Sequence, residues 1–130
     1  MNENEMRILI VDDCEEIRLL MEDLLRMDGY EKIDLAENGS EALEKIMEME
    51  RAGEIYSLVI TDLEMPVMGG LELIKSVRNR KCGIPILVMS GSMDAELKER
   101  IMNSGINGFM RKPVNFRDFK ETVRGLLFQI

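Results

Sequence analysis

The sequence predicts an α/β protein in which helices cover both faces of one parallel sheet. Short apolar runs that fit buried strands alternate five times with stretches whose apolar residues recur at helical spacing. Such alternation is typical of β-α-β units with right-handed crossovers. The chain has 130 residues and is 45% hydrophobic, with no internal repeat or linker-like segment. We therefore expect one domain spanning residues 1–130.

Five segments are predicted to be strands of this sheet. Three are short and strongly apolar, and they cover residues 8–11, 58–60 and 84–89. Two weaker candidates cover residues 32–36 and 108–111. Ligands of such sheets bind beyond the carboxyl ends of the strands, where the strand order reverses. Functional side chains are therefore expected directly after these segments.

Three stretches between the strands each carry one apolar face at helical spacing. The first contains Ile17, Leu20, Met21, Leu24 and Leu25; the second Ala42, Leu43, Ile46 and Met47; the last Phe119, Val123, Leu126, Leu127 and Ile130. N-cap residues three positions before an acidic residue predict the helix starts, in the pairs Asp13 and Glu16, Asn38 and Glu41, and Asn115 and Asp118. Glycines predict the helix ends, at Gly29, Gly53 and Gly105.

Composition excludes several classes of function. With 17 basic and 25 acidic residues the net charge is −8, which argues against direct binding to nucleic acid or to anionic membranes. The chain has no histidine, and Cys14 and Cys82 lack metal-ligand spacing, so zinc sites and histidine-dependent catalysis are not expected. The acidic N-terminus does not resemble a signal peptide, and no apolar run is long enough for a membrane helix. We expect a cytoplasmic protein.

Polar residues follow four of the predicted strands. Asp12 and Asp13 follow the first, Asp62 the third, Ser90 the fourth and Lys112 the fifth. If the strand order is 2-1-3-4-5, the ends of the first and third strands are neighbours and three carboxylates converge. Each residue alone has a simpler explanation, such as a helix cap, a turn residue or a solvated lysine. Their joint placement at strand ends favours a functional site.

Clustered carboxylates favour a bound cation, and an all-oxygen ligand set suits Mg²⁺. A carboxylate can also attack phosphorus and form an acyl phosphate. The transferred phosphoryl oxygens then need positive charge and hydrogen bonds, which Mg²⁺, Lys112 and the Ser90 hydroxyl can supply. The pattern is therefore compatible with phosphoryl transfer to one of these carboxylates.

The sequence resembles the response-regulator receiver domains of the CheY-like kind over essentially its whole length. The resemblance rests on residues 8–13, 58–70, 89–91 and 108–113, which read ILIVDD, LVITDLEMPVMGG, MSG and GFMRKP. It implies a flavodoxin-like (βα)5 fold, doubly wound, with a five-stranded parallel sheet in the order 2-1-3-4-5. It also implies a receiver of a two-component system or phosphorelay.

The resemblance implies a role for each matching residue. Asp62 matches the phosphoacceptor, and the metal ligands are Asp12, Asp13, Asp62 and the backbone carbonyl of Glu64, with Asp12 acting partly through water. The remaining matches are the switch hydroxyl Ser90, the phosphoryl-pairing Lys112, the switch aromatic Phe109 and Pro113, whose preceding peptide bond is expected to be cis. Gly69 departs from the family, which often has aspartate at this position.

The implied phosphoryl donor is a phosphohistidine on a histidine kinase or histidine phosphotransfer protein. A downstream effector is expected to read the surface formed by residues 94–128, and the chain is expected to be a monomer or a phosphorylation-dependent dimer. It would not be an enzyme beyond catalysing its own phosphorylation and dephosphorylation. We also hypothesise that Glu64, an acid beside the pocket, affects water access and thus dephosphorylation.

Two other interpretations remain open. A pseudo-receiver would keep the fold purely as an interaction module. A metal-dependent phosphohydrolase with an aspartate nucleophile would be a true enzyme, although 130 residues leave no room for a substrate cap. Formation of an acyl phosphate, or turnover of a small phosphate ester, distinguishes these alternatives.

Overall fold

The computed structural model describes residues 2–91 and 94–128 and contains one five-stranded parallel sheet in the order β2-β1-β3-β4-β5. The strands are β1 (Arg7–Val11), β2 (Lys32–Ala36), β3 (Leu58–Asp62), β4 (Ile86–Ser90) and β5 (Gly108–Arg111). The helices are η1 (Glu3–Glu5), a short 3-10 helix, and α1 (Glu15–Met27), α2 (Gly39–Arg51), α3 (Gly70–Asn79), α4 (Ala95–Met102) and α5 (Phe116–Phe128). The predicted fold class and strand order are confirmed.

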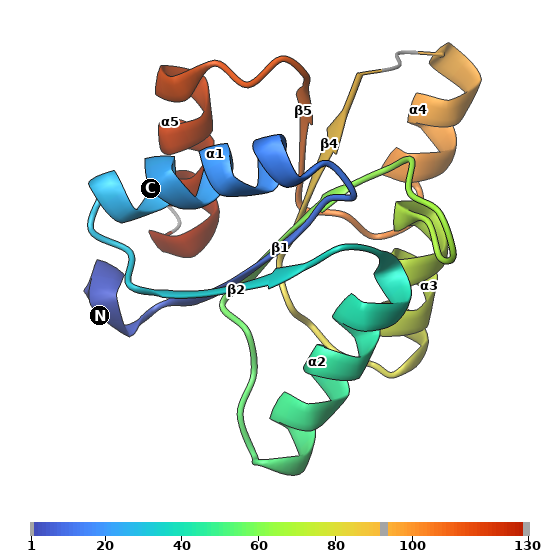
Figure 1. Ribbon diagram of the computed structural model, residues 1–130. Coiled ribbons are helices and arrows are strands. Elements are labelled where there is room, and N and C mark those ends of the chain that lie inside the picture. The colour runs from blue at the N-terminus through green and yellow to red at the C-terminus, as the bar shows by residue number, and fades with distance from the viewer. Residues whose placement is uncertain (1, 92–93, 129–130) are drawn as a thin grey trace.

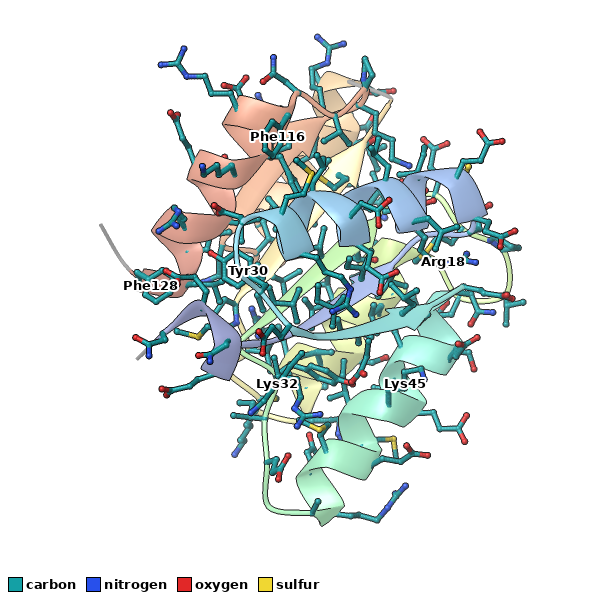
Figure 2. The ribbon with its side chains drawn as sticks, turned by 60° about the vertical axis from the view of Figure 1, so that its left-hand side comes forward. Arg18, Tyr30, Lys32, Lys45, Phe116 and Phe128 are labelled. Atoms are coloured by element: carbon teal, nitrogen blue, oxygen red, sulfur yellow. The ribbon has the colours of Figure 1, made fainter. Side chains whose placement is uncertain are left out.

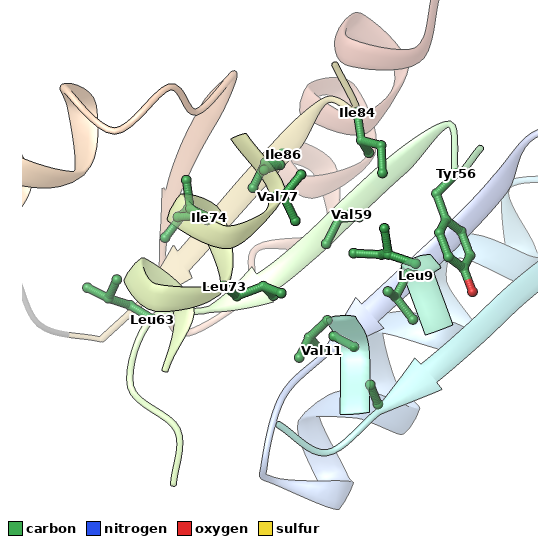
Figure 3. Packing of buried hydrophobic residues seen from close by; sticks show 14 of the residues in the cluster. Leu9, Val11, Tyr56, Val59, Leu63, Leu73, Ile74, Val77, Ile84 and Ile86 are labelled. Carbon is green, nitrogen blue, oxygen red and sulfur yellow. The ribbon is translucent and has the colours of Figure 1, made fainter. Parts of the chain in front are cut away.

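The sheet separates two apolar cores. Helices α1 and α5 lie on one face, and α2, α3 and α4 lie on the other (Figure 1). The core under α1 and α5 includes Ile8, Met21, Leu25, Phe119 and Val123. The core on the other face includes Leu9, Val59, Leu73, Ile74 and Val77 (Figure 3). Because the central strands are buried on both faces, their sequences are apolar almost without interruption.

All five predicted strands are present, but three have different bounds. β1 begins at Arg7 rather than at residue 8, β3 ends at Asp62 rather than at residue 60, and β4 ends at Ser90 rather than at residue 89. Residues 84–89 were expected to form a strand, but β4 begins at Ile86. Pro85 has no N–H group to donate to the neighbouring strand, although its carbonyl oxygen accepts a hydrogen bond from the N–H of Val59 at 2.9 Å. Regular pairing therefore starts one residue after the proline.

Two helix predictions need correction. Leu20 was placed on the buried face of α1, but it is 46% exposed, whereas Met21 and Leu25 are buried. At about 100° per residue, Leu20 lies about 100° from Met21 and about 140° from Leu25, which places it outside their buried stripe. Asp13 was expected to cap α1, but the N-cap is Cys14 and has no side-chain cap bond. The expected contribution of Ile130 lies outside the described residues.

The remaining capping predictions are confirmed. Asn38 accepts a hydrogen bond from the N–H of Glu41 at 2.9 Å, and Asn115 accepts one from the N–H of Asp118 at 3.1 Å. The three glycines predicted to end helices, Gly29, Gly53 and Gly105, all have positive φ angles. Within the described part of the chain, no helix combines the length and apolarity needed to cross a membrane.

Candidate functional site

Three carboxylates converge at the carboxyl ends of β1 and β3. These strands are neighbours, with Val11 opposite Thr61, so Asp12 and Asp13 emerge beside Asp62. One carboxylate oxygen from each aspartate lies within 4.8 Å of the others. Asp12 and Asp62 are buried and Asp13 is exposed, so the cluster has a closed floor and an open side. This arrangement confirms the predicted convergence.

Lys112 supplies the positive charge in this cluster. Its Nζ lies 2.8 Å from Oδ2 of Asp12 and 3.2 Å from Oδ2 of Asp62. The backbone N–H of Lys112 donates to the carbonyl oxygen of Ser90 at 2.9 Å, which ties the end of β5 to β4. The peptide bond between Lys112 and Pro113 is cis. One ammonium group thus bridges two aspartates from different strands.

The electrostatics of Asp62 and Lys112 follow from their burial and proximity. Burial raises the pKa of Asp62, the negative charge of Asp12 raises it further, and Lys112 offsets only part of this effect. Burial would lower the pKa of Lys112, but the hydrogen bond to Asp12 and the charges of Asp62 and Asp12 outweigh it, so the pKa is raised. Lys112 therefore stays protonated at neutral pH, while Asp62 is a more basic carboxylate than an ordinary aspartate.

Asp12 is held by three further contacts. Its Oδ1 accepts a hydrogen bond from the N–H of Cys14 at 2.9 Å, and its N–H donates to the carbonyl oxygen of Ala36 at 3.1 Å. Its own carbonyl oxygen accepts a hydrogen bond from the guanidinium of Arg18 at 2.7 Å. The Arg18 side chain is 11% exposed and lies between α1 and the sheet (Figure 2). These contacts fix the loop that carries both Asp12 and Asp13.

Arg18 is a site residue that sequence reasoning missed. An arginine at the end of the first turn of an amphipathic helix usually extends into solvent, and the backbone carbonyl that it binds belongs to no motif. Its spacing of six residues from Asp12 was the available signal, because this places it in the first turn of the helix that follows the acidic pair. We interpret Arg18 as a positioning residue for the acidic loop.

The other predicted site residues lie around the cluster at different depths. Ser90 is the last residue of β4 and is buried, and the preceding residue, Met89, pairs with Asp62 in the sheet. Phe109 is half-buried and packs against the core under α2, α3 and α4. Glu64 is exposed two residues beyond Asp62. The described contacts therefore join Asp12 and Asp62 through Lys112, with Asp13 beside them and Ser90 connected through the backbone.

Glycine at position 70 fits α3 tightly against the site. A Cβ atom there would clash with the carbonyl oxygen of Asp62 and lie 2.9 Å from the Cα of Leu63. The N–H of Gly70 also donates to the carbonyl oxygen of Leu63 at 2.9 Å. The start of α3 therefore rests on the backbone that carries Asp62, and only glycine allows this close approach.

The arrangement can bind a divalent cation and present a carboxylate to an electrophile. All the available side-chain donors are oxygens, which suits a hard ion such as Mg²⁺. Both oxygens of Asp12 already have partners, Cys14 and Lys112, whereas Asp13 is exposed on the open side. The donor set therefore fits a site in which Asp13, on the open side, and the neighbouring Asp62 supply the direct carboxylate ligands.

Comparisons with known proteins agree with this geometry. The family model of the response regulator receiver domain matches residues 8–124. The chain is 34% identical over 115 residues to the osmosensing histidine protein kinase SLN1 of Saccharomyces cerevisiae, covering 87% of this chain and 9% of the kinase. It is 34% identical over 124 residues to the chemotaxis protein CheY1 of Helicobacter pylori, covering 94% of this chain and 97% of that protein.

A solved structure has the same fold over nearly the whole chain. The crystal structure of a CheY-like response regulator receiver domain protein from Methanospirillum hungatei JF-1 matches with a TM-score of 0.84 and 30% identity, over 95% of this chain and 94% of that one. The chain spans only 9% of the yeast kinase, and about half or less of three further curated relatives that it matches. The shared unit is thus a module that occurs in proteins of very different length.

Proposed function

The chain belongs to the response regulator receiver domain family, whose members are phosphoacceptor modules of two-component signalling, and we propose that Asp62 is its phosphoacceptor. One observation carries this assignment. Asp62 ends a buried strand with its carboxylate between two other aspartates and the ammonium of Lys112. No other carboxylate among the described residues belongs to such a cluster together with Asp12 and Asp13.

The proposed reaction is transfer of a phosphoryl group from a phosphohistidine. A carboxylate oxygen of Asp62 attacks the phosphorus, the bond between phosphorus and the imidazole nitrogen breaks, and the electron pair returns to the imidazole. Lys112 keeps Asp62 ionised before the attack and pairs with the phosphoryl oxygens afterwards. The hydroxyl of Ser90, at the end of the adjacent strand, would donate a hydrogen bond to the same group. The donor would be a histidine kinase or a histidine phosphotransfer protein.

Asp12, Asp13, Asp62 and the backbone carbonyl of Glu64 would hold the Mg²⁺ ion. Asp13 and Asp62 would be direct ligands, and Asp12, whose two oxygens already have partners, would act partly through water. Bound Mg²⁺ would neutralise charge that develops on the phosphoryl oxygens. Arg18 would act through the backbone, because it fixes the loop that positions Asp12 and Asp13.

Phosphorylation would act as a switch rather than as a step in turnover. A new group at Asp62 would favour one arrangement of Ser90 and Phe109 over another. Phe109 packs on the same face as α4, so its movement would reach the surface formed by residues 94–128, which we assign to a downstream effector. We expect a monomer or a phosphorylation-dependent dimer in the cytoplasm, with no turnover of small phosphate esters.

Incubation with acetyl phosphate and Mg²⁺, followed by intact-protein mass spectrometry, tests this proposal. The wild-type chain should gain one phosphoryl group, and EDTA should suppress the reaction. Asp62→Asn should abolish the adduct, whereas Asp23→Asn, which changes an exposed aspartate on α1, should react as the wild type does. An adduct that persists in Asp62→Asn would refute the assignment of Asp62. Absence of an adduct with every phosphodonor would favour an interaction module.

A further inference from the structure

A pocket of about 410 Å³ lies between α3, α4 and the loop that follows β3. Its apolar lining comes from Leu63, Leu71 and Leu97, which belong to or pack against the core under α2, α3 and α4. Gly69 adds no side chain, and a Cβ atom there would approach only backbone oxygens, the nearer being that of Leu63 at 3.4 Å. The volume falls in the range of ligand-binding pockets and exceeds that of one large apolar side chain.

The remaining lining residues give the pocket a charged rim. Glu64, Glu72 and Lys75 are all exposed. Within the described part of the chain, none of these three side chains makes a hydrogen bond or an ion pair, whereas many other charged residues of the protein do. Two glutamates against one lysine leave the rim with an excess of negative charge. The rim is therefore free to pair with charges on a ligand.

We propose that this pocket binds a segment of a partner protein that presents an apolar side chain next to a lysine or arginine. The apolar lining selects the anchor, and the two glutamates select the neighbouring cation. The net charge of −8 adds a longer-range attraction for a basic segment. The same charge disfavours a second copy of this chain as the occupant, because two acidic rims would face each other.

The position of the pocket connects it to the acidic site. Leu63 follows Asp62 directly, and its N–H donates to the carbonyl oxygen of Met89 at 3.1 Å. Its carbonyl oxygen accepts the hydrogen bond from Gly70 that begins α3. An occupant of the pocket would therefore contact the loop that leaves Asp62. Binding of a segment in this pocket does not require Asp62 to be the phosphoacceptor, so each of the two proposals can be refuted without the other.

An NMR titration of the ¹⁵N-labelled chain with two short blocked peptides tests the proposal. One peptide alternates leucine with lysine, and the other has glutamate in place of each lysine. The lysine peptide should shift the amide signals of Leu63, Gly69, Leu71 and Leu97 at sub-millimolar to millimolar concentration, and the glutamate peptide should bind at least about 10-fold more weakly. Repetition with Asp62→Ala should give the same shifts.

Matched variants separate the pocket from general attraction to an acidic protein. Glu72→Lys should weaken binding of the lysine peptide by about 3- to 10-fold, whereas Glu44→Lys, the same charge change on an exposed position of α2, should have a much smaller effect. Leu97→Ala should also weaken binding, unlike Met102→Ala on the same helix, where the residue is 56% exposed. Equal effects of the two charge reversals, shifts spread over the acidic surface, or no shifts with the lysine peptide would overturn the proposal.

Discussion

Replacement of Lys112 by alanine should destabilise the protein by about 2–3 kcal/mol at neutral pH in EDTA. The ammonium lies 2.8 Å from Asp12 and 3.2 Å from Asp62, and its side chain is only 17% exposed. Breaking a fully buried ion pair costs about 3–5 kcal/mol, and an exposed pair contributes about 0–1 kcal/mol. The site lies closer to the first limit, but one aspartate of the cluster is exposed, and solvent there screens the repulsion that the substitution leaves behind.

Urea unfolding followed by circular dichroism measures this loss. A change of 2–3 kcal/mol corresponds to a fall in Tm of roughly 6–15 °C for a domain of this size. Arg117→Ala is the control, because the pair of Arg117 with Glu121 has side chains 86% and 67% exposed, and removing it should have little effect. Saturating Mg²⁺ should restore part of the stability lost in Lys112→Ala, since the ion replaces the missing positive charge.

A double-mutant cycle with Asp62→Asn measures how much of the effect of Lys112 comes from its interaction with Asp62. In the Asp62→Asn background, fewer negative charges need compensation, so Lys112→Ala should cost at least about 1 kcal/mol less than in the wild type. A loss below about 0.5 kcal/mol for Lys112→Ala alone, or strict additivity in the cycle, would contradict the electrostatic account of the site. Either result would mean that solvent, rather than Lys112, balances the aspartates.

Three further predictions address single residues. Because burial and Asp12 raise the pKa of Asp62, the folded state binds its proton more tightly than the unfolded chain does. Ionised Asp62 therefore destabilises the fold, and Asp62→Asn should add about 1 kcal/mol to the free energy of unfolding at neutral pH. This gain should shrink as the pH falls through the pKa of Asp62 in the folded state. An unchanged urea midpoint at pH 7 would contradict the prediction. Val67 has a φ angle of 69° and is 82% exposed, and asparagine adopts this left-handed conformation more readily than a β-branched residue does. Val67→Asn should therefore raise the free energy of unfolding by about 1 kcal/mol and with it the urea midpoint. A lower midpoint would show that the loop is not strained there. Arg18→Met should weaken Mg²⁺ binding about 10-fold in a calorimetric titration through loss of its bond to the Asp12 carbonyl, and equal affinity would remove its positioning role.

The sequence was informative where one physical rule decides the outcome. Parallel strands end at the same edge of a sheet, so the convergence of Asp12, Asp13, Asp62 and Lys112 followed from their places after apolar runs. Which residues at the edge of a helix are buried, and which residue caps the helix, were harder to predict from the sequence. Leu20 is exposed although the next residue of α1, Met21, is buried. The N-cap is Cys14 instead of Asp13, and the N–H of Cys14 donates a hydrogen bond to the side chain of Asp12.

Features that depend on the packing of separate elements left at most a weak signal in the sequence. The bond from Arg18 to a backbone carbonyl requires the exact distance between α1 and the end of β1. The pocket next to Leu63 requires Leu97 of α4, Leu71 of α3 and Gly69 of the intervening loop to line the same cavity. No local sequence pattern determines these distances, because they depend on how the helices pack against the sheet and against each other.

The ion pair between Glu3 and Arg124, 3.6 Å apart, brings the beginning and the end of the described chain to one side of the molecule (Figure 1). A host polypeptide could therefore enter and leave this fold at nearly the same point, without stretching across the sheet. Such a geometry makes the module suitable for insertion within a longer protein and for circular permutation through a short artificial connection.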